Sequence, residues 1–212
     1  MYEGKNRVKK VSTGTFFTTL LLIGKNVVFD GTPPRASHIN HNLTYIERMI
    51  NMQYDRNAAV NYAREWAYRR NPQYFDFSDI GGDCTNFASQ CIYAGAKIMN
   101  YTPVFGWFYI NVNNRTPSWT GVNELYNFLV NNTSVGPQGE TVPLSRIQNG
   151  DIIQLKFNPG SRFDHSPVVI DRGNGTPSTI LLAAHSNDSY NRPLSSYRYI
   201  DLRPVHIYNV GE

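Results

Sequence analysis

Two residues with reactive side chains, Cys84 and His165, stand about eighty positions apart in this chain of 212 residues. Cys84 follows Gly81-Gly82-Asp83 and opens a segment with apolar residues at three- and four-residue intervals, which predicts a helix from Cys84 to about Lys97. The unpaired N–H groups at a helix start stabilise a thiolate, which lowers its pKa, and they can also bind an oxyanion. The alternative is a small buried residue in an amphipathic helix, as most free cysteines are.

His165 opens a predicted strand over residues 165–171, where it could accept a proton from a thiol on a packed helix. Taken alone, it could equally be a polar residue at a strand edge. A further predicted strand over residues 179–186 ends beside His185, Asn187 and Asp188. Any of these three side chains could orient the ring of His165 and support its charged form.

The rest of the chain supplies helices first and strands afterwards, which predicts an α+β fold. Asp55 is a candidate N-cap for a helix that ends before Asn71-Pro72, and Thr120 is a candidate N-cap for another. Residues 100–117 show no clear period and are expected to form a loop. Beyond the strands already described, we expect strands over residues 152–157, 197–202 and 205–208.

With these elements in place, the chain resembles the bacterial putative amidase domain family, which is allied to the CHAP and NlpC-type cell-wall hydrolases of the papain-like superfamily. The resemblance covers about residues 54–208. Its carriers are the segments Tyr54-Asp55-Arg56-Asn57-Ala58-Ala59-Val60-Asn61-Tyr62-Ala63, Gly82-Asp83-Cys84-Thr85-Asn86-Phe87-Ala88-Ser89-Gln90, Pro117-Ser118-Trp119, Gly150-Asp151-Ile152-Ile153-Gln154 and Asp164-His165-Ser166. It implies a papain-like fold in which N-terminal helices pack on an antiparallel sheet.

The resemblance also implies catalytic roles for three residues. Cys84 would be the nucleophile and His165 the general base. The orienting residue would be His185 by analogy with NlpC-type relatives, which we favour, or Asn187 or Asp188 by analogy with CHAP relatives. One departure from the family pattern is Pro167, which removes a hydrogen-bond donor from the strand after His165 and requires a bulge or an unpaired strand edge there.

The function implied is that of a thiol-dependent amidohydrolase, an amidase or peptidase that cleaves an amide bond of cell-wall peptide through a thioester acyl-enzyme, without a cofactor or metal. Two other interpretations remain open. One is a non-catalytic wall-binding module of the same fold. The other is a zinc-binding protein with Cys84, His165 and His185 as ligands, although the short paired spacings of zinc sites are absent.

We expect two parts in the chain: an N-terminal extension and linker over residues 1–50 and the amidase domain over residues 51–212. The apolar run 15–23 follows several lysines and an arginine. It fits a degenerate signal peptide and, equally well, an amphipathic extension or a strand. It is too short to span a bilayer. A secreted or cell-envelope location is favoured over the cytoplasm.

Composition narrows the range of partners. The net charge of +4 is spread along the chain, with no basic stripe that would indicate a nucleic-acid partner. The two cysteines, Cys84 and Cys91, would lie about 10 Å apart on one helix, too far for a disulfide. Trp107, Tyr109 and Trp119 could line a sugar-binding groove, although aromatic residues more often belong to the core.

Overall fold

The structure is a computed structural model that describes residues 53–160 and 162–212. The N-terminal extension expected over residues 1–50 lies outside the described residues. The division of the chain near residue 50 therefore stays a prediction.

Helix α2 spans Arg56–Trp66 and begins as predicted. The carboxylate of Asp55 accepts a hydrogen bond from the N–H of Ala58 at 2.9 Å, so that it satisfies one of the unpaired donors of the first turn. Ala59 and Ala63 are fully buried and small, so another helix can approach this face closely. The helix ends at Trp66, several residues before the predicted stop at Asn71-Pro72.

Helix α3 spans Cys84–Ala96, which confirms the predicted helix at both ends. It ends at Lys97, whose left-handed conformation (φ 59°) turns the chain away. Most residues of α3 are buried, and not only those of a single stripe, because α3 packs against α2 and α4 and also contacts the sheet. The nucleophile candidate therefore lies at the start of the most enclosed helix of the domain.

The two following helices are short. Helix α4 spans Pro117–Thr120 and α5 spans Val122–Asn131. The prediction of Thr120 as an N-cap was wrong, since Thr120 ends α4 and Gly121 precedes α5. Strands β1 (Tyr109–Asn111) and β2 (Asn114–Arg115) form a small hairpin within the segment expected to be a loop.

The aromatic residues of this region belong to the core and not to an open groove. Trp107 and Trp119 have no exposed surface, and their ring centroids are 4.9 Å apart. The indole N–H of Trp107 donates to Ser89 at 3.0 Å and that of Trp119 to Asn86 at 2.9 Å. Both acceptors lie on α3, so these aromatic residues hold in place the helix that begins at Cys84.

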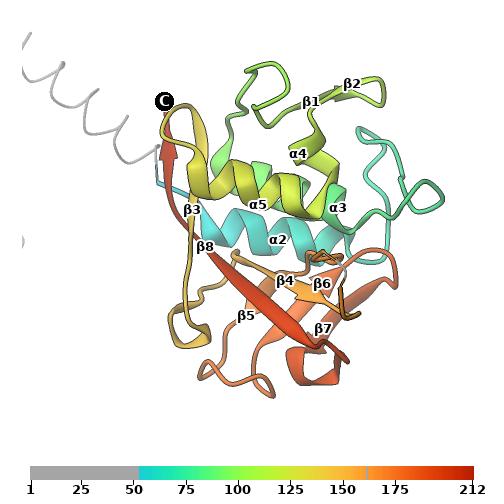
Figure 1. The fold of residues 1–212 in the computed structure, drawn as a ribbon, viewed down its shortest axis with the longest axis vertical. Coiled ribbons are helices and arrows are strands. Elements are labelled where there is room, and N and C mark those ends of the chain that lie inside the picture. The colour runs from blue at the N-terminus through green and yellow to red at the C-terminus, as the bar shows by residue number, and fades with distance from the viewer. Residues whose placement is uncertain (1–52, 161) are drawn as a thin grey trace, which may run out of the picture. The chain divides into compact units, whose positions relative to one another are not determined.

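The remaining strands form one curled, antiparallel, six-stranded sheet in the order β3-β8-β4-β5-β6-β7. Their bounds are β3 Gly136–Thr141, β4 Ile152–Lys156, β5 Val168–Asp171, β6 Leu181–Ala184, β7 Ser189–Pro193 and β8 Asp201–Gly211. Short 3₁₀ helices span Leu144–Arg146 and Leu194–Ser196. Figure 1 shows α2, α3 and α5 grouped on one side, with the curled sheet below them.

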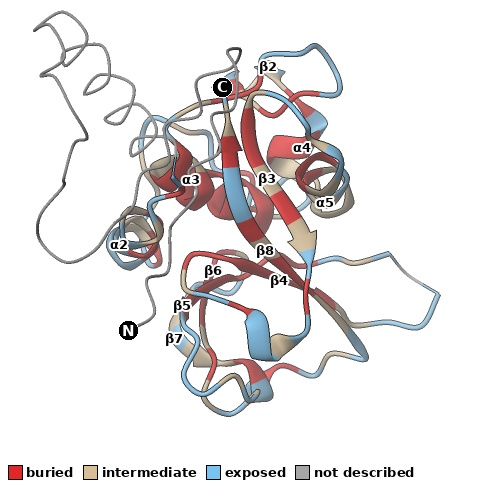
Figure 2. Ribbon diagram, turned by 90° about the vertical axis from the view of Figure 1, so that its left-hand side faces the viewer, coloured by how far each residue is buried: buried red, intermediate tan, exposed pale blue. Residues whose placement is uncertain are grey.

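The sheet is buried on both faces, as Figure 2 shows for its central strands. Side chains alternate between the faces along each strand. On β4, Ile152 belongs to the core shared with the helices, whereas Ile153 and Leu155 belong to a second core on the other face. That second core is closed by residues of the connecting segments, including Ile147 and Leu194.

The strand predictions were correct in part. β4 and β6 fall inside their predicted ranges, but β5 begins only at Val168, because Pro167 interrupts the strand after His165. The strand expected over residues 205–208 lies within β8, whereas the one expected over 197–202 was wrong for residues 197–200, since β8 begins at Asp201. β3 and β7 had not been predicted.

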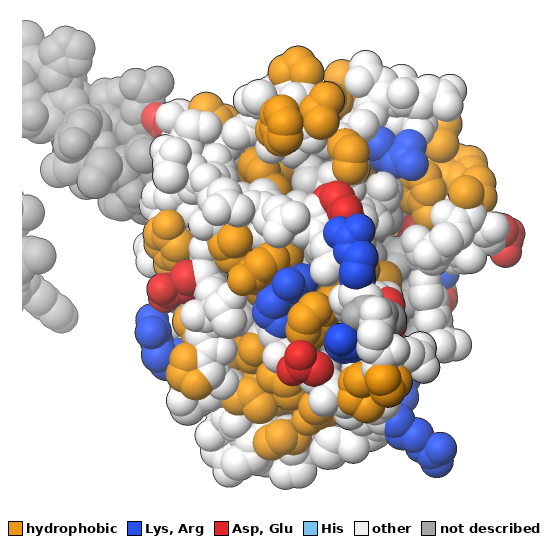
Figure 3. All heavy atoms as spheres, viewed as in Figure 1, with side chains coloured by type: hydrophobic (Ala, Val, Ile, Leu, Met, Phe, Trp, Pro, Cys, Tyr) orange, Lys and Arg blue, Asp and Glu red, His pale blue; other side chains and the backbone are white. Residues whose placement is uncertain are grey.

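The surface seen in Figure 3 mixes hydrophobic and polar side chains, and its lysines and arginines stand in small separate groups. Within residues 53–160 and 162–212, no helix has the length and apolar character needed to cross a bilayer.

Candidate active site

The loop before α3 brings the chain into the first turn at Cys84. Gly81 and Gly82 both have positive φ, 91° and 102°, a conformation that favours glycine. A Cβ on Gly82 would lie 3.2 Å from the hydroxyl oxygen of Ser186, tighter than ordinary packing. That same hydroxyl accepts a hydrogen bond from the N–H of Asp83 at 2.7 Å. The loop is thereby tied to the segment that follows β6.

Cys84 is the first residue of α3 and is 7% exposed. It lines a cavity of about 450 Å³ whose wall also includes His165. The structure thus brings together the two residues that the sequence pairs as nucleophile and base. Cys84 and Cys91 are both free thiols, and Cys91 is completely buried in the core.

The pKa of Cys84 is raised, mainly because burial disfavours the thiolate. Backbone hydrogen bonding from Ser166 and contacts with Thr85 oppose this effect, and the nearby charge of Asp83 adds to it. The expectation of a lowered pKa at the helix start was therefore wrong in net direction, since burial outweighs the helix start. The sulfur is a neutral thiol in the resting site and needs a base to remove its proton.

His165 is held by two backbone hydrogen bonds with Leu155 on β4, of 2.9 and 3.3 Å. Its ring lies between Phe157 and Tyr197, with centroid distances of 6.0 and 5.8 Å. Burial, with a smaller effect from the charge of Arg192, lowers the pKa of His165 to about 4. The imidazole is therefore neutral near pH 7 and able to accept a proton.

The backbone around Pro167 shows how the sheet accommodates a proline that has no N–H donor. The carbonyl of Pro167 accepts from the N–H of Ile153 at 3.0 Å, so the proline still takes part in the sheet as an acceptor. Its missing N–H separates the bridge at His165 from the regular strand that starts at Val168. The backbone of His165 is thus tied to β4 rather than to β6.

His185 is placed elsewhere, and the orienting contact predicted for it with His165 is absent. One ring nitrogen of His185, Nδ1, lies 2.6 Å from Asp83 Oδ2, and the other, Nε2, lies 2.9 Å from the carbonyl oxygen of Trp66. The ring also stacks on Phe87 at a centroid distance of 4.0 Å and is 1% exposed. Both ring nitrogens are therefore engaged by oxygen atoms of other residues, and neither is left to contact His165.

The contact with His185 is one of several that hold the carboxylate of Asp83 in place. Its carboxylate accepts hydrogen bonds from the N–H of Phe77 at 2.9 Å and from the amide of Asn86 at 2.8 Å, in addition to contacting His185. It makes no side-chain cap to α3. Asp83 therefore has a structural role in the loop before α3. The N–H groups of the first turn of α3 have no side-chain cap and can serve an oxyanion.

The other two candidates for an orienting residue differ from each other. Asp188 is occupied by Arg70, whose two terminal nitrogens lie 2.8 and 3.0 Å from its oxygens. Asn187 lines the cavity with Cys84 and His165, in an unusual conformation with φ 111°. No hydrogen bond joins it to His165 among the described residues, and neither nitrogen of the His165 ring has a hydrogen-bond partner there.

Several wall residues were not foreseen from the sequence, among them Phe157, Arg192 and Tyr197. Arg192 lies on β7, which was not predicted as a strand, and Tyr197 follows a 3₁₀ turn. The signal that could have indicated them is their position within a few residues of predicted strands, but nothing in the pattern tells which way they face.

A three-ligand zinc site on Cys84, His165 and His185 is not assembled. Both nitrogens of His185 are engaged by Asp83 and by the backbone of Trp66. The described part of the chain holds no other group of three or more His, Cys, Asp or Glu side chains arranged to bind a metal.

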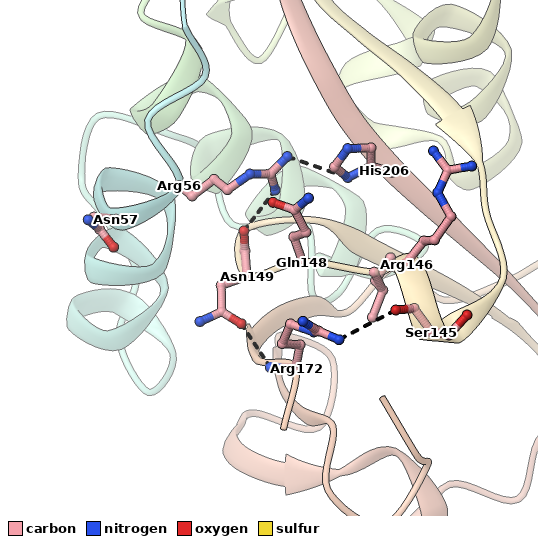
Figure 4. A pocket seen from close by; sticks show the side chains of 9 residues that line it. Arg56, Asn57, Ser145, Arg146, Gln148, Asn149, Arg172 and His206 are labelled. Carbon is pink, nitrogen blue, oxygen red and sulfur yellow. Dashed lines mark hydrogen bonds between the residues drawn. The ribbon is translucent and has the colours of Figure 1, made fainter. Parts of the chain in front are cut away.

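A second cavity, of about 500 Å³, is rich in basic residues, including Arg56, Arg172 and His206 (Figure 4). Its polar groups are largely hydrogen-bonded to one another. The residues that line it include no cysteine.

Comparison with known proteins supports an assignment to a family. Residues 53–208 match the family described as Putative amidase domain. Over 126 residues the chain is 35% identical to Uncharacterized protein YhbB of Bacillus subtilis strain 168; this stretch is 58% of the chain and 39% of that protein, so the similarity spans well under half of the relative. No solved structure matches the chain. Because the family match covers most of its length, the chain belongs to the Putative amidase domain family.

Proposed function

We propose that this protein is a cysteine-dependent amidase of papain-like type that hydrolyses an amide bond in cell-wall peptide. The observation that carries the proposal is the shared cavity of Cys84 and His165. The cavity is large enough for a short stretch of peptide, and its walls come from residues far apart in the chain, including Gly82, His165 and Arg192. The helix that bears the cysteine packs on an antiparallel sheet next to the histidine, as in a papain-like enzyme.

In the acylation step, His165 takes the proton of the Cys84 thiol as the sulfur attacks the carbonyl carbon of the amide. The lowered pKa of His165 keeps its imidazole in the neutral form that can accept this proton, and the raised pKa of Cys84 keeps the proton on the sulfur until the attack begins. The uncapped N–H groups at the start of α3 stabilise the oxyanion of the tetrahedral intermediate. His165 then gives the proton to the leaving amine as the C–N bond breaks, which leaves a thioester on Cys84.

In the second step, a water molecule attacks the thioester carbonyl while His165 accepts a proton from it. The C–S bond breaks, the carboxylic acid leaves, and the proton returns to the sulfur. Asn187 is the best-placed of the three predicted side chains to steady the imidazolium, since it lines the same cavity. His185 takes a positioning role: its contact with Asp83 fixes the loop that leads into Cys84.

The test is incubation of the protein with purified peptidoglycan, followed by identification of the released fragments by mass spectrometry. The wild type should release fragments that end in a new carboxylate. Cys84→Ala should release none above background and keep its fold by circular dichroism. Cys91→Ala is the matched control, since it removes a sulfur from the core of the same helix and should leave turnover intact.

The alternatives give different results in the same experiment. Binding to isolated wall material with no fragment released by the wild type would favour a non-catalytic wall-binding module. Stoichiometric zinc in the wild type that is lost in Cys84→Ala would favour a zinc protein. Undiminished fragment release by Cys84→Ala would refute the proposed nucleophile.

A further inference from the structure

The arginines of the domain fall into two groups. Some pair with carboxylates, as Arg56 does with Asp151, Arg70 with Asp188, and Arg162 with Glu124, whereas others, such as Arg115 and Arg203, form no ion pair within the described residues. Arg192 forms no ion pair with any residue that the structure describes, yet it lies in the wall of the Cys84 cavity. We propose that Arg192 forms a subsite that binds a carboxylate of the substrate, next to the amide that Cys84 attacks. This inference rests on the proposed function.

The Arg192 side chain is held in place rather than free. Its Nε donates to the hydroxyl of Ser196 at 3.0 Å, and its Nη2 makes a longer contact of 3.4 Å with the carbonyl of the same residue. The guanidinium carbon lies 3.7 Å from the centre of the Tyr197 ring, which stabilises a cation above its face. The remaining terminal nitrogen, Nη1, has no acceptor within the described residues. A fixed guanidinium with a free edge is suited to a planar anion.

Tyr197 also fixes the distance of this subsite from the reacting groups. Its ring lies below Arg192 and, at a centroid distance of 5.8 Å, next to His165. The guanidinium and the imidazole therefore lie close to the same aromatic ring. A carboxylate bound to Arg192 would therefore lie about one to two amino-acid residues away from the scissile carbonyl along the substrate. Each residue spans roughly 3.5 Å of extended chain.

The charge of the cavity wall agrees with an anionic ligand. The wall contains two guanidinium groups, Arg192 and the exposed Arg198, and one carboxylate, Asp164. With a neutral thiol and a neutral imidazole, the wall is positive overall. A carboxylate is favoured over a larger anion, since the available edge of Arg192 matches its planar pair of oxygens. The carboxylate could come from a peptide C-terminus or from an acidic side chain.

The test uses two alkylating reagents that differ only in charge, iodoacetate and iodoacetamide. The rate of labelling at Cys84 in the full chain is followed by mass spectrometry. The rate with iodoacetate is divided by the rate with iodoacetamide, and this ratio is then divided by the same ratio for free glutathione. This normalised ratio cancels any change in thiolate population, because that change affects both reagents. We expect a ratio of about ten for the wild type and about one for Arg192→Gln, with an intermediate value for Arg192→Lys, which keeps the charge but not the fork. Arg172→Gln, on an exposed residue of the other cavity, should match the wild type.

Competition then distinguishes the two sources of carboxylate. N-acetyl-alanine offers a terminal carboxylate, and the α-amide of N-acetyl-glutamate offers a side-chain carboxylate. The compound that carries the preferred carboxylate should slow iodoacetamide labelling more than its uncharged amide does. This difference should be seen only in proteins that keep Arg192. Equal protection by the acids and their amides, or a rate ratio that Arg192→Gln leaves unchanged, would overturn the subsite alone. If neither reagent labels Cys84, the proposed function fails and the subsite with it.

Discussion

The cavities at Cys84 and at Arg56 each bring an arginine and a histidine together, but they differ in how far their polar groups are already bonded. At Arg56, the buried carboxylate of Asp151 accepts from the guanidinium at 2.7 Å and from the N–H of Ile207 at 3.0 Å, and His206 Nδ1 lies 2.8 Å from it (Figure 4 shows the basic wall). At Cys84, the ring of His165 has no hydrogen-bond partner among the described residues, and Arg192 has no carboxylate.

We interpret this difference as one between a structural joint and the reactive site that we propose. Arg56 opens α2, Asp151 precedes β4 and His206 lies on β8, so their contacts fasten three elements to one another. A group whose donors and acceptors are all used cannot also serve a substrate without breaking the joint. The groups at Cys84 keep that capacity, although burial makes an unused polar group costly to maintain. We therefore expect substitutions in the two cavities to affect different properties.

The largest effect should come from the base. His165→Gln removes proton transfer while keeping a polar side chain of similar length, so turnover should fall by about 10²–10⁴-fold. His206→Gln, the matched change in the other cavity, should leave turnover per folded molecule within about twofold. Fragment release from peptidoglycan, normalised to the folded fraction, is the measurement. The comparison would break down if His206→Gln had the larger effect on turnover.

The reverse should hold for stability. Asp151→Ala removes the acceptor of several hydrogen bonds and leaves the charge of Arg56 uncompensated, so the free energy of unfolding should fall by about 3–5 kcal/mol. Asp79→Ala, at an exposed position, should change it by less than about 0.5 kcal/mol. Urea denaturation measures both, and turnover of the Asp151→Ala protein that remains folded should be close to that of the wild type. Equal stabilities of the two variants would contradict the structural assignment.

A smaller effect concerns pH. The pKa of His165 is lowered from 6.5 to about 4 by burial and by Arg192, so the unfolded chain binds a proton there at a higher pH than the folded chain does. The corresponding stability is fully present above pH 6.5 and is lost as the pH falls through 4. Between pH 7 and pH 4 the wild type should lose about 3 kcal/mol more than His165→Gln, because the variant lacks this titration. Identical losses would show that His165 is not buried as described.

The sequence predicted the parts of the site that depend on local pattern. The start of α3 at Cys84 follows from two glycines before an amphipathic segment, and the position of His165 follows from the apolar run after it. The third residue could not be predicted in this way. After β6 the backbone leaves the strand, and Ser186 and Asn187 have positive φ, 63° and 111°, so the alternation of side chains no longer tells which residue faces the cavity. His185 turns to Asp83, and Asn187 takes the cavity position.

Two strands escaped prediction for related physical reasons. β3, Gly136–Thr141, contains two glycines and a proline and has no alternating pattern, and its place in the sheet comes from pairing with β8. β7, Ser189–Pro193, is a polar edge strand whose residues are mostly half-buried. Arg192 lies on β7, so the proposed carboxylate subsite was also hidden from the sequence pattern.

The central claim is that the sulfur of Cys84 forms the covalent intermediate. It is tested most directly by quenching a reaction of the wild type with peptidoglycan in acid, digesting the protein and mapping added mass by tandem mass spectrometry. We predict a thioester-linked peptide fragment on Cys84 that disappears on treatment with hydroxylamine, with none on Cys91. Fragment release without any adduct on Cys84, together with an adduct on another residue, would contradict the account.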